Sequence, residues 1–282
     1  MELILITNDI DVAKYAEECG VDRIMVDIEW IGKKERQGHL NTVISGHTIN
    51  DVYKVRKVIS TAKLMVRINP IHNNSYIEIS EVINAGAEIL MLPMFKYKEE
   101  VEYFIDIVGN KAVKNLLLET PQAVVRINNI LSISNIDEIY IGLNDLHIGM
   151  GLDFLFELLS GGIVEYLVEK FKNKNIKYGF GGISRLGCGL VDSALILSEH
   201  YRLNSKMVIL SRDFKGYVEN YSELREKIDL KQEIQKIRGY LEYLKNLSYD
   251  ELLANKNELI KKVNEVVTEI RKKKSIPFFS NK

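Results

Sequence analysis

The chain has 282 residues, of which 46% are hydrophobic and 27% charged, and its formal net charge is -1. This length suits one large α/β barrel or two domains, and the composition is that of a soluble globular protein. A net charge near zero gives no reason to expect nucleic acid or an anionic membrane as a partner. The N-terminal segment lacks a basic start and is soon interrupted by Asp9 and Asp11, so we expect neither a signal peptide nor a membrane span. We therefore expect a cytoplasmic protein.

Eight short apolar segments recur along the first 210 residues, and each is followed by a helix-like pattern. Most of them are continuously apolar, as expected when both faces of a strand are buried in a parallel sheet. The predicted strands are Leu3–Thr7, Arg23–Ile28, Lys63–Ile68, Glu88–Leu92, Lys114–Leu118, Glu138–Gly142, Lys177–Gly181 and Met207–Leu210.

The intervening segments carry the end signals of helices. Val101, Phe104 and Val108 form an apolar stripe on one face of a helix after the fourth strand. Thr120 and Pro121 predict an N-cap and a first-turn proline for the next helix.

Positions just past four successive strands recur at a fixed interval. Arg67, Pro93, Glu119 and Asp145 stand 26 residues apart, which is about one strand plus one helix. This period is typical of a (β/α)8 barrel, or TIM barrel, and a doubly wound open sheet is the alternative. We assign residues 1–228 to the barrel and residues 229–282 to an extension.

The extension has a different pattern. Apolar residues recur at three-four spacing in two stretches, and Ser248 and Glu251 between them predict a capping box that opens the second helix. This pattern predicts an amphipathic helical hairpin, which either covers its own barrel or packs on another subunit. The two stretches contain Ile234, Ile237, Leu241 and Leu244, and then Leu259, Val263, Val266 and Ile270.

Five charged residues are expected at the mouth of the barrel, where the C-terminal ends of parallel strands meet. Asp27 and Glu29 end the second strand, Arg67 the third, Glu119 the fifth and Asp145 the sixth. Unpaired acids at one mouth repel each other, so the set suggests a divalent metal held by oxygen ligands. The structural alternative is that Asp27 or Glu29 pairs with Arg67 and that Asp145 caps the following helix.

The positions of the lysines and histidines disfavour two other kinds of site, a Schiff base and a zinc site. The lysines next to the predicted strands precede them, so none of these four is placed to form a Schiff base at the mouth. No pair of histidines sits on strand ends at the spacing of zinc ligands. The four lysines are Lys63, Lys114, Lys177 and Lys206.

A glycine-rich segment follows the seventh strand. Gly181 and Gly182 could bring backbone N–H groups close to an anion, with Arg185 as its partner, although a plain tight turn explains them equally well.

Five spaced motifs follow one another along the predicted barrel: Val21–Glu29, Met65–Asn69, Gly86–Pro93, Leu118–Pro121 and Ile141–Gly149. Together they resemble the HpcH/HpaI aldolase and citrate lyase β-subunit family, within the phosphoenolpyruvate mutase and isocitrate lyase superfamily. The likeness covers about residues 1–215.

This resemblance implies a site. Glu119 and Asp145 correspond to residues that bind Mg²⁺ or Mn²⁺, with Co²⁺ as a further candidate, and Arg67 corresponds to a residue that contacts a 2-oxo acid substrate and stabilises its enolate. The family is typically oligomeric, often with exchange of C-terminal helices, so we expect a homo-oligomer. The further candidates for binding the substrate are Asp27, Asn144, Gly181 and Gly182.

Two positions depart from the family. Trp30 stands where its aldolases usually carry a relay histidine, and Leu117 where they carry a glutamine. The acid–base group must therefore come from elsewhere, or the reaction differs. His39 and His47 are the first candidates, and Glu29 and metal-bound water are the others. We expect a metal-dependent carbon–carbon lyase acting on a hydroxy 2-oxo acid. The alternatives are a citrate-lyase-like acyl-CoA lyase and a non-catalytic barrel that binds metal and 2-oxo acid.

Overall fold

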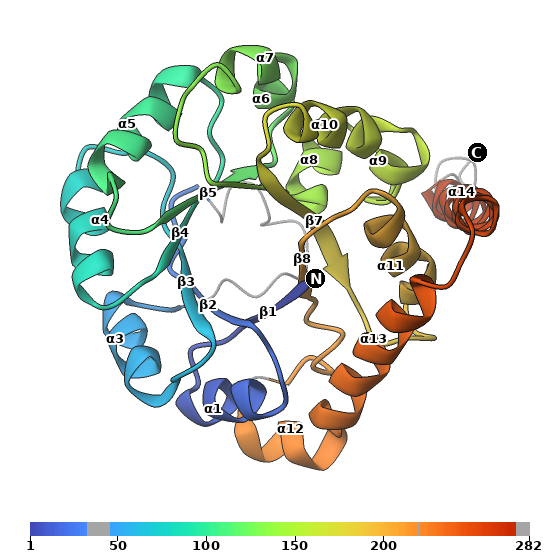
Figure 1. Ribbon diagram of the computed structural model, residues 1–282, viewed down its shortest axis with the longest axis horizontal. Helices are drawn as coiled ribbons and strands as arrows, with labels where there is room; N and C mark the ends of the chain where they lie inside the picture. Colours follow the sequence, from blue (N-terminus) through green and yellow to red (C-terminus); the bar gives the residue numbers. More distant parts are fainter. Residues whose placement is uncertain (33–45, 219, 275–282) are drawn as a thin grey trace, which may run out of the picture.

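The computed structural model describes residues 1–32, 46–218 and 220–274. Eight parallel strands close into a barrel in chain order, because β1 pairs with both β2 and β8 (Figure 1). The predicted (β/α)8 barrel is confirmed. The strands are β1 Glu2–Ile6, β2 Arg23–Asp27, β3 Lys63–Arg67, β4 Ile89–Leu92, β5 Val113–Leu118, β6 Glu138–Ile141, β7 Lys177–Ile183 and β8 Met207–Leu210.

Helices form the outer ring around the strands (Figure 1). None of those in the three described ranges is long and apolar enough to cross a membrane. They are α1 Ile10–Glu18, α3 Ile49–Val58, α4 Ser75–Asn84, α5 Lys98–Val108, α6 Pro121–Val125, α7 Ile127–Ile130, α8 Leu143–Gly149, α9 Glu157–Ser160, α10 Ile163–Lys172, α11 Ser193–Arg202, α12 Tyr221–Lys227, α13 Leu230–Leu244 and α14 Tyr249–Lys274.

The inside of the barrel is closed at the N-terminal ends of the strands. There the buried Arg23 guanidinium donates to Glu138 at 2.6 and 2.7 Å, and Asn115 donates to the same carboxylate at 3.0 Å. Above this layer, a cluster of apolar side chains fills the barrel, so the interior opens only at the C-terminal end. The cluster contains Ile4, Met25, Met65, Ile89, Met91, Leu117, Tyr140 and Met207.

Strand β7 extends two residues beyond the prediction, to Ile183, and its pairing with β8 is irregular. The Tyr140 hydroxyl accepts from the backbone N–H of Ile209 at 2.8 Å and donates to the carbonyl of Gly181. The register between β7 and β8 shifts between Gly179 and Gly182. Gly181 takes φ +59°, in the left-handed region that favours glycine.

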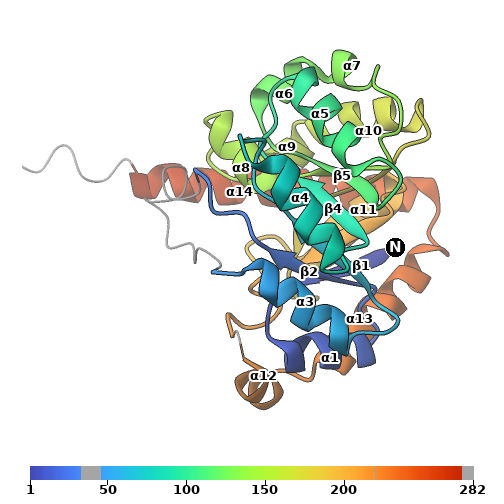
Figure 2. The same ribbon diagram turned by 90° about the vertical axis from the view of Figure 1, so that its left-hand side faces the viewer.

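The C-terminal helices lie against the barrel of the same chain. Helix α14 is seen end-on in Figure 1 and lengthwise in Figure 2, so it runs along the barrel axis. Its apolar stripe packs on α11 and α9, with Leu252, Leu259, Val263 and Val267 buried. Ser248 and Glu251 form the predicted capping box. These contacts lie within one chain, and the expected homo-oligomer stays a prediction.

Candidate active site

An ion pair joins the ends of β2 and β3. The parallel register sets Asp27 directly opposite Arg67. The guanidinium donates through Nε to Oδ1 at 2.8 Å and through Nη2 to Oδ2 at 2.7 Å. The Glu29 carboxylate lies 3.5 Å from the same Nε. Burial acts to lower the pKa of Arg67, but the charges of Asp27 and Glu29 outweigh it and hold that pKa well above the usual value. The expected pairing of Asp27 or Glu29 with Arg67 is therefore confirmed.

Glu119 lies at the end of β5 and is almost fully buried, with 3% of its surface exposed. Its Oε1 accepts from the backbone N–H of Met94 at 3.2 Å. Burial raises the pKa of Glu119 well above its usual range, and the nearby charge of Asp145 raises it further, while Arg67 acts in the opposite direction. Two carboxylates that repel in this way favour a cation between them.

Asp145 reaches the same cavity from the first turn of α8. The N-cap of this helix is Gly142, and Asp145 lies in its first turn, where a carboxylate interacts favourably with the helix dipole. Gly142 is also needed for Glu119, because a Cβ at position 142 would lie 2.8 Å from Glu119 Oε2. The sequence shows this glycine but not its neighbour at the end of the adjacent strand β5.

The side chains at this mouth offer few ligands to a metal ion. No group of three or more His, Cys, Asp or Glu side chains within residues 1–32, 46–218 and 220–274 could hold one. Two carboxylates still fit Mg²⁺ or Mn²⁺, since these ions keep several water or substrate oxygens beside one or two protein carboxylates. Glu119 and Asp145 therefore fit as ligands.

Two of the three candidate acid–base side chains, His47 and Glu29, lie next to the Asp27–Arg67 pair. His47 lies beside the ion pair, because its Nδ1 accepts the backbone N–H of Asp27 at 3.0 Å. Glu29 is buried against Arg67. His39 lies outside the described residues. Trp30 does not enter the cavity, and its side chain is 67% exposed.

A cavity of about 420 Å³ opens at the C-terminal end of the strands. Arg67, Glu119 and Asp145 line one part of it. The predicted substrate-binding residues Asn144, Gly181 and Gly182 also line it, whereas Asp27 lies behind Arg67.

The segment after β8 contributes further charged side chains to the cavity. Arg212 and Lys215 line the cavity, whereas Arg185, the expected partner of an anion, does not. Lys215 is buried, and its Nζ donates to the carbonyl of Ile6 at 3.0 Å. A lysine therefore does reach the mouth, and it could not be predicted because it follows β8 in an irregular segment.

Comparison with known proteins decides the family. The family model described as HpcH/HpaI aldolase/citrate lyase matches residues 3–154, more than half of the chain. The chain belongs to the HpcH/HpaI family. Membership supports a lyase-type function. A comparison with curated proteins finds no match.

Solved structures share the fold of this HpcH/HpaI family member. An HpcH/HpaI aldolase from Desulfitobacterium hafniense is 12% identical with a TM-score of 0.59, over 88% of this chain and 94% of that chain. A family protein from Burkholderia cenocepacia is 12% identical with a TM-score of 0.60, over 84% and 94%. The citrate synthase SbnG is 13% identical with a TM-score of 0.58, over 84% and 94%. At these identities the likeness shows the fold alone.

Proposed function

We propose that this protein is a divalent-metal-dependent carbon–carbon lyase of the class II aldolase type. Its substrate would be a hydroxy 2-oxo acid, which splits into a pyruvate-like unit and an aldehyde. The observation that carries the proposal is the placement of Glu119, Asp145 and Arg67 around one cavity. Two repelling carboxylates beside a fixed cation provide for both a metal ion and a developing negative charge.

Glu119 and Asp145 would hold Mg²⁺ or Mn²⁺, with Co²⁺ as a further candidate. When bound, such an ion acts as a Lewis acid toward the oxygens of a 2-oxo acid. The proton that burial favours on Glu119 must leave for the carboxylate to serve as a ligand. Metal affinity should therefore rise with pH.

Arg67 would stabilise the negative charge of the enolate left when the carbon–carbon bond breaks. Its guanidinium is always protonated, so it serves as a fixed charge and not as the general base. Asp27 holds this group by two hydrogen bonds, which orients it before substrate arrives. We assign Asp27 to positioning Arg67 rather than to direct substrate contact.

His47 is the proton carrier that we propose. Its Nδ1 accepts from a backbone N–H, so in the neutral ring the proton lies on Nε2. Glu29 is a poorer candidate, because its carboxylate is buried and lies 3.5 Å from Nε of Arg67.

A cleavage assay tests the function. Pyruvate released from a series of 4-hydroxy-2-oxo acids is followed with lactate dehydrogenase and NADH, with Mn²⁺ or with a chelator. We expect release that needs metal and falls at least about 100-fold in Glu119→Gln and in Asp145→Asn. Release that persists in chelator would contradict the metal assignment. Metal binding without any release would favour a non-catalytic binding barrel.

A further inference from the structure

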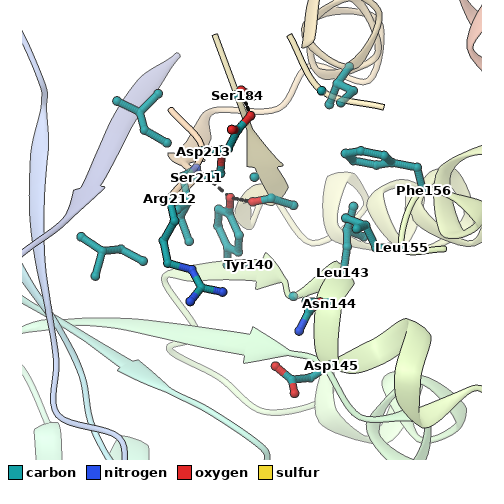
Figure 3. Close-up of a pocket in the computed structure, with 18 of the residues that line it drawn as sticks. Tyr140, Leu143, Asn144, Asp145, Leu155, Phe156, Ser184, Ser211, Arg212 and Asp213 are labelled. Atoms are coloured by element: carbon teal, nitrogen blue, oxygen red, sulfur yellow. Dashed lines mark hydrogen bonds between the residues drawn. The ribbon is translucent and has the colours of Figure 1, made fainter. Parts of the chain in front are cut away.

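The cavity is much larger than a pyruvate unit, and its lining is both charged and apolar. Arg67, Glu119 and Asp145 line it together with a group of apolar side chains, which we call the apolar arm. Figure 3 shows Leu143, Leu155 and Phe156 together on one side of the cavity and Arg212 across from them. The apolar arm is lined by Leu143, Phe154, Phe156, Leu190, Val191 and Ile196.

We propose that the apolar arm binds the aldehyde half of the substrate, and that this aldehyde carries an aliphatic or aromatic tail rather than sugar hydroxyls or an anion. The inference rests on the proposed function and names the class of its substrate. A single continuous cavity holds both halves, so the tail would lie in the arm while the 2-oxo acid lies beside Arg67, Glu119 and Asp145.

The arm is already formed in the folded chain. Phe154 and Phe156 pack edge to face, with ring centroids 5.3 Å apart, and each is only 8% exposed. They come from the connection between α8 and α9. Val191 and Ile196, from the segment after β7 and from α11, are each 2% exposed. Because these walls are packed from behind, little side-chain ordering would accompany binding.

Three of the polar side chains that line the cavity, those of Ser184, Ser193 and Asp213, are engaged in hydrogen bonds within the protein. The Ser184 hydroxyl donates to Asp213, and the backbone N–H of Ser184 donates to the Ser193 hydroxyl at 2.9 Å. A sugar tail would therefore give up its hydrogen bonds to water and find few replacements here.

Besides Arg67, two cationic side chains line the cavity: Lys215, which already donates to the carbonyl of Ile6, and Arg212, which is the group that an anionic tail would use. No hydrogen bond or ion pair joins its guanidinium to the part of the chain that the structure describes. It is exposed, however, and lies across the cavity from the apolar wall (Figure 3). A carboxylate seated in the arm itself would be desolvated without a partner, which is costly. The apolar tail is therefore favoured.

N-alkyl oxamates test the proposal without turnover. Oxamate resembles the enolate of pyruvate, and an alkyl group on its nitrogen extends from the position where the carbon–carbon bond forms. Dissociation constants are measured by calorimetry with Mn²⁺ for oxamate and its N-methyl, N-propyl and N-pentyl derivatives. We expect roughly fourfold tighter binding per buried methylene, and no such gain for N-hydroxyethyl or N-carboxymethyl oxamate.

The outcomes separate this inference from the proposed function. Absent binding of oxamate itself would overturn the proposed function and this inference with it. Binding of oxamate with a flat or falling alkyl series would overturn the apolar arm alone. Tightest binding by N-carboxymethyl oxamate would replace the apolar tail with an anionic one and would point to Arg212.

A variant at the rim of the arm gives a second readout. Leu190 lines the arm but is 71% exposed, so Leu190→Asp places a charge there without burying it in the core. The quantity compared is the ratio of N-pentyl to plain oxamate affinity within each variant. We expect this ratio to fall on the order of tenfold. Val125→Asp, at an 85% exposed residue of α6, is the matched control and should keep the wild-type ratio. An unchanged ratio in Leu190→Asp would contradict the proposal.

Discussion

Arg67 is held by Asp27, and this pair shows what a single register position contributes. The two residues face each other because β2 and β3 pair in parallel with Asp27 opposite Arg67. The guanidinium is thereby held with two of its donors already engaged. Its remaining donors and its charge are the part available to a substrate.

Asp27→Asn should reduce turnover through geometry. The amide cannot accept both hydrogen bonds or balance the charge, so Arg67 would move and lose part of its stabilisation of the enolate. We expect kcat/KM to fall by roughly 10-fold to 100-fold while Mn²⁺ affinity changes little. Steady-state kinetics and metal calorimetry on one preparation check both parts.

A surface pair supplies the control for Asp27→Asn. Glu242 pairs with Lys245 on α13, and both side chains are more than half exposed. Glu242→Gln should leave kcat/KM unchanged. Equal losses in the two variants would mean that the effect at position 27 is not one of site geometry.

Glu119 gives the metal-free protein a pH-dependent stability. Its pKa is raised in the folded state by burial and by Asp145. The stabilisation linked to its proton is thus complete below the unfolded pKa near 4.5 and is lost as pH rises through the folded pKa. This loss is at most about 1.4 kcal/mol per pH unit. Glu119→Gln removes it, so in chelator its Tm should exceed that of the wild type by a margin that grows from about pH 5 to about pH 8.

Added Mn²⁺ should reverse this order. The ion needs the deprotonated carboxylate, so it should raise the Tm of the wild type more at the higher pH and raise that of Glu119→Gln much less. A margin between the two proteins that is independent of pH in chelator would contradict the raised pKa.

The sequence predicted which residues lie at the mouth of the barrel where these residues are close to strand ends. Arg67, Glu119 and Asp145 could be placed at the mouth because each lies at or shortly after the end of a strand in a regular period. Gly142 and Lys215 could not be placed in the same way. Their roles depend on neighbours from other strands, Glu119 for the first and Ile6 for the second.

At the scale of elements, the continuously apolar strands were predicted well because parallel strands in a barrel are buried on both faces. The end of β7 was missed. Its pairing with β8 is irregular there, and the hydroxyl of Tyr140, on a different strand, accepts from the backbone of Ile209. The packing of α14 also needed the structure. Its three-four spacing shows an apolar stripe, but not which surface covers that stripe.

Val263→Asp tests the packing of α14 on its own barrel. Val263 is fully buried on the face that contacts α11 and α9, so a carboxylate there would lack a partner. We expect about 3 kcal/mol of lost stability or more, a fall in Tm of roughly 6 to 12 °C. Thr268→Asp, on an exposed turn of the same helix, should change Tm by less than about 2 °C. Similar losses in both variants would contradict this packing.

At the scale of the whole molecule, the site depends on the closure of the barrel. The ends of β2, β3, β5 and β6 come from four separate parts of the chain, and only the closed barrel brings them to one mouth. The polar layer around Arg23 and the apolar cluster above it seal the other end. Family resemblance and spacing together anticipated this arrangement. The size and apolar character of the arm were not anticipated, since its walls come from connections after β6 and β7.

The central claim is that Glu119, Asp145 and Arg67 form a metal-dependent enolate site. Its most direct test is the exchange of pyruvate methyl protons for deuterium, followed by NMR with Mg²⁺ and with chelator. We predict exchange by the wild type only with metal, and a loss of at least about 100-fold in Glu119→Gln and in Asp145→Asn. Exchange that survives these substitutions, or a wild type that exchanges nothing with any divalent metal, would contradict the claim.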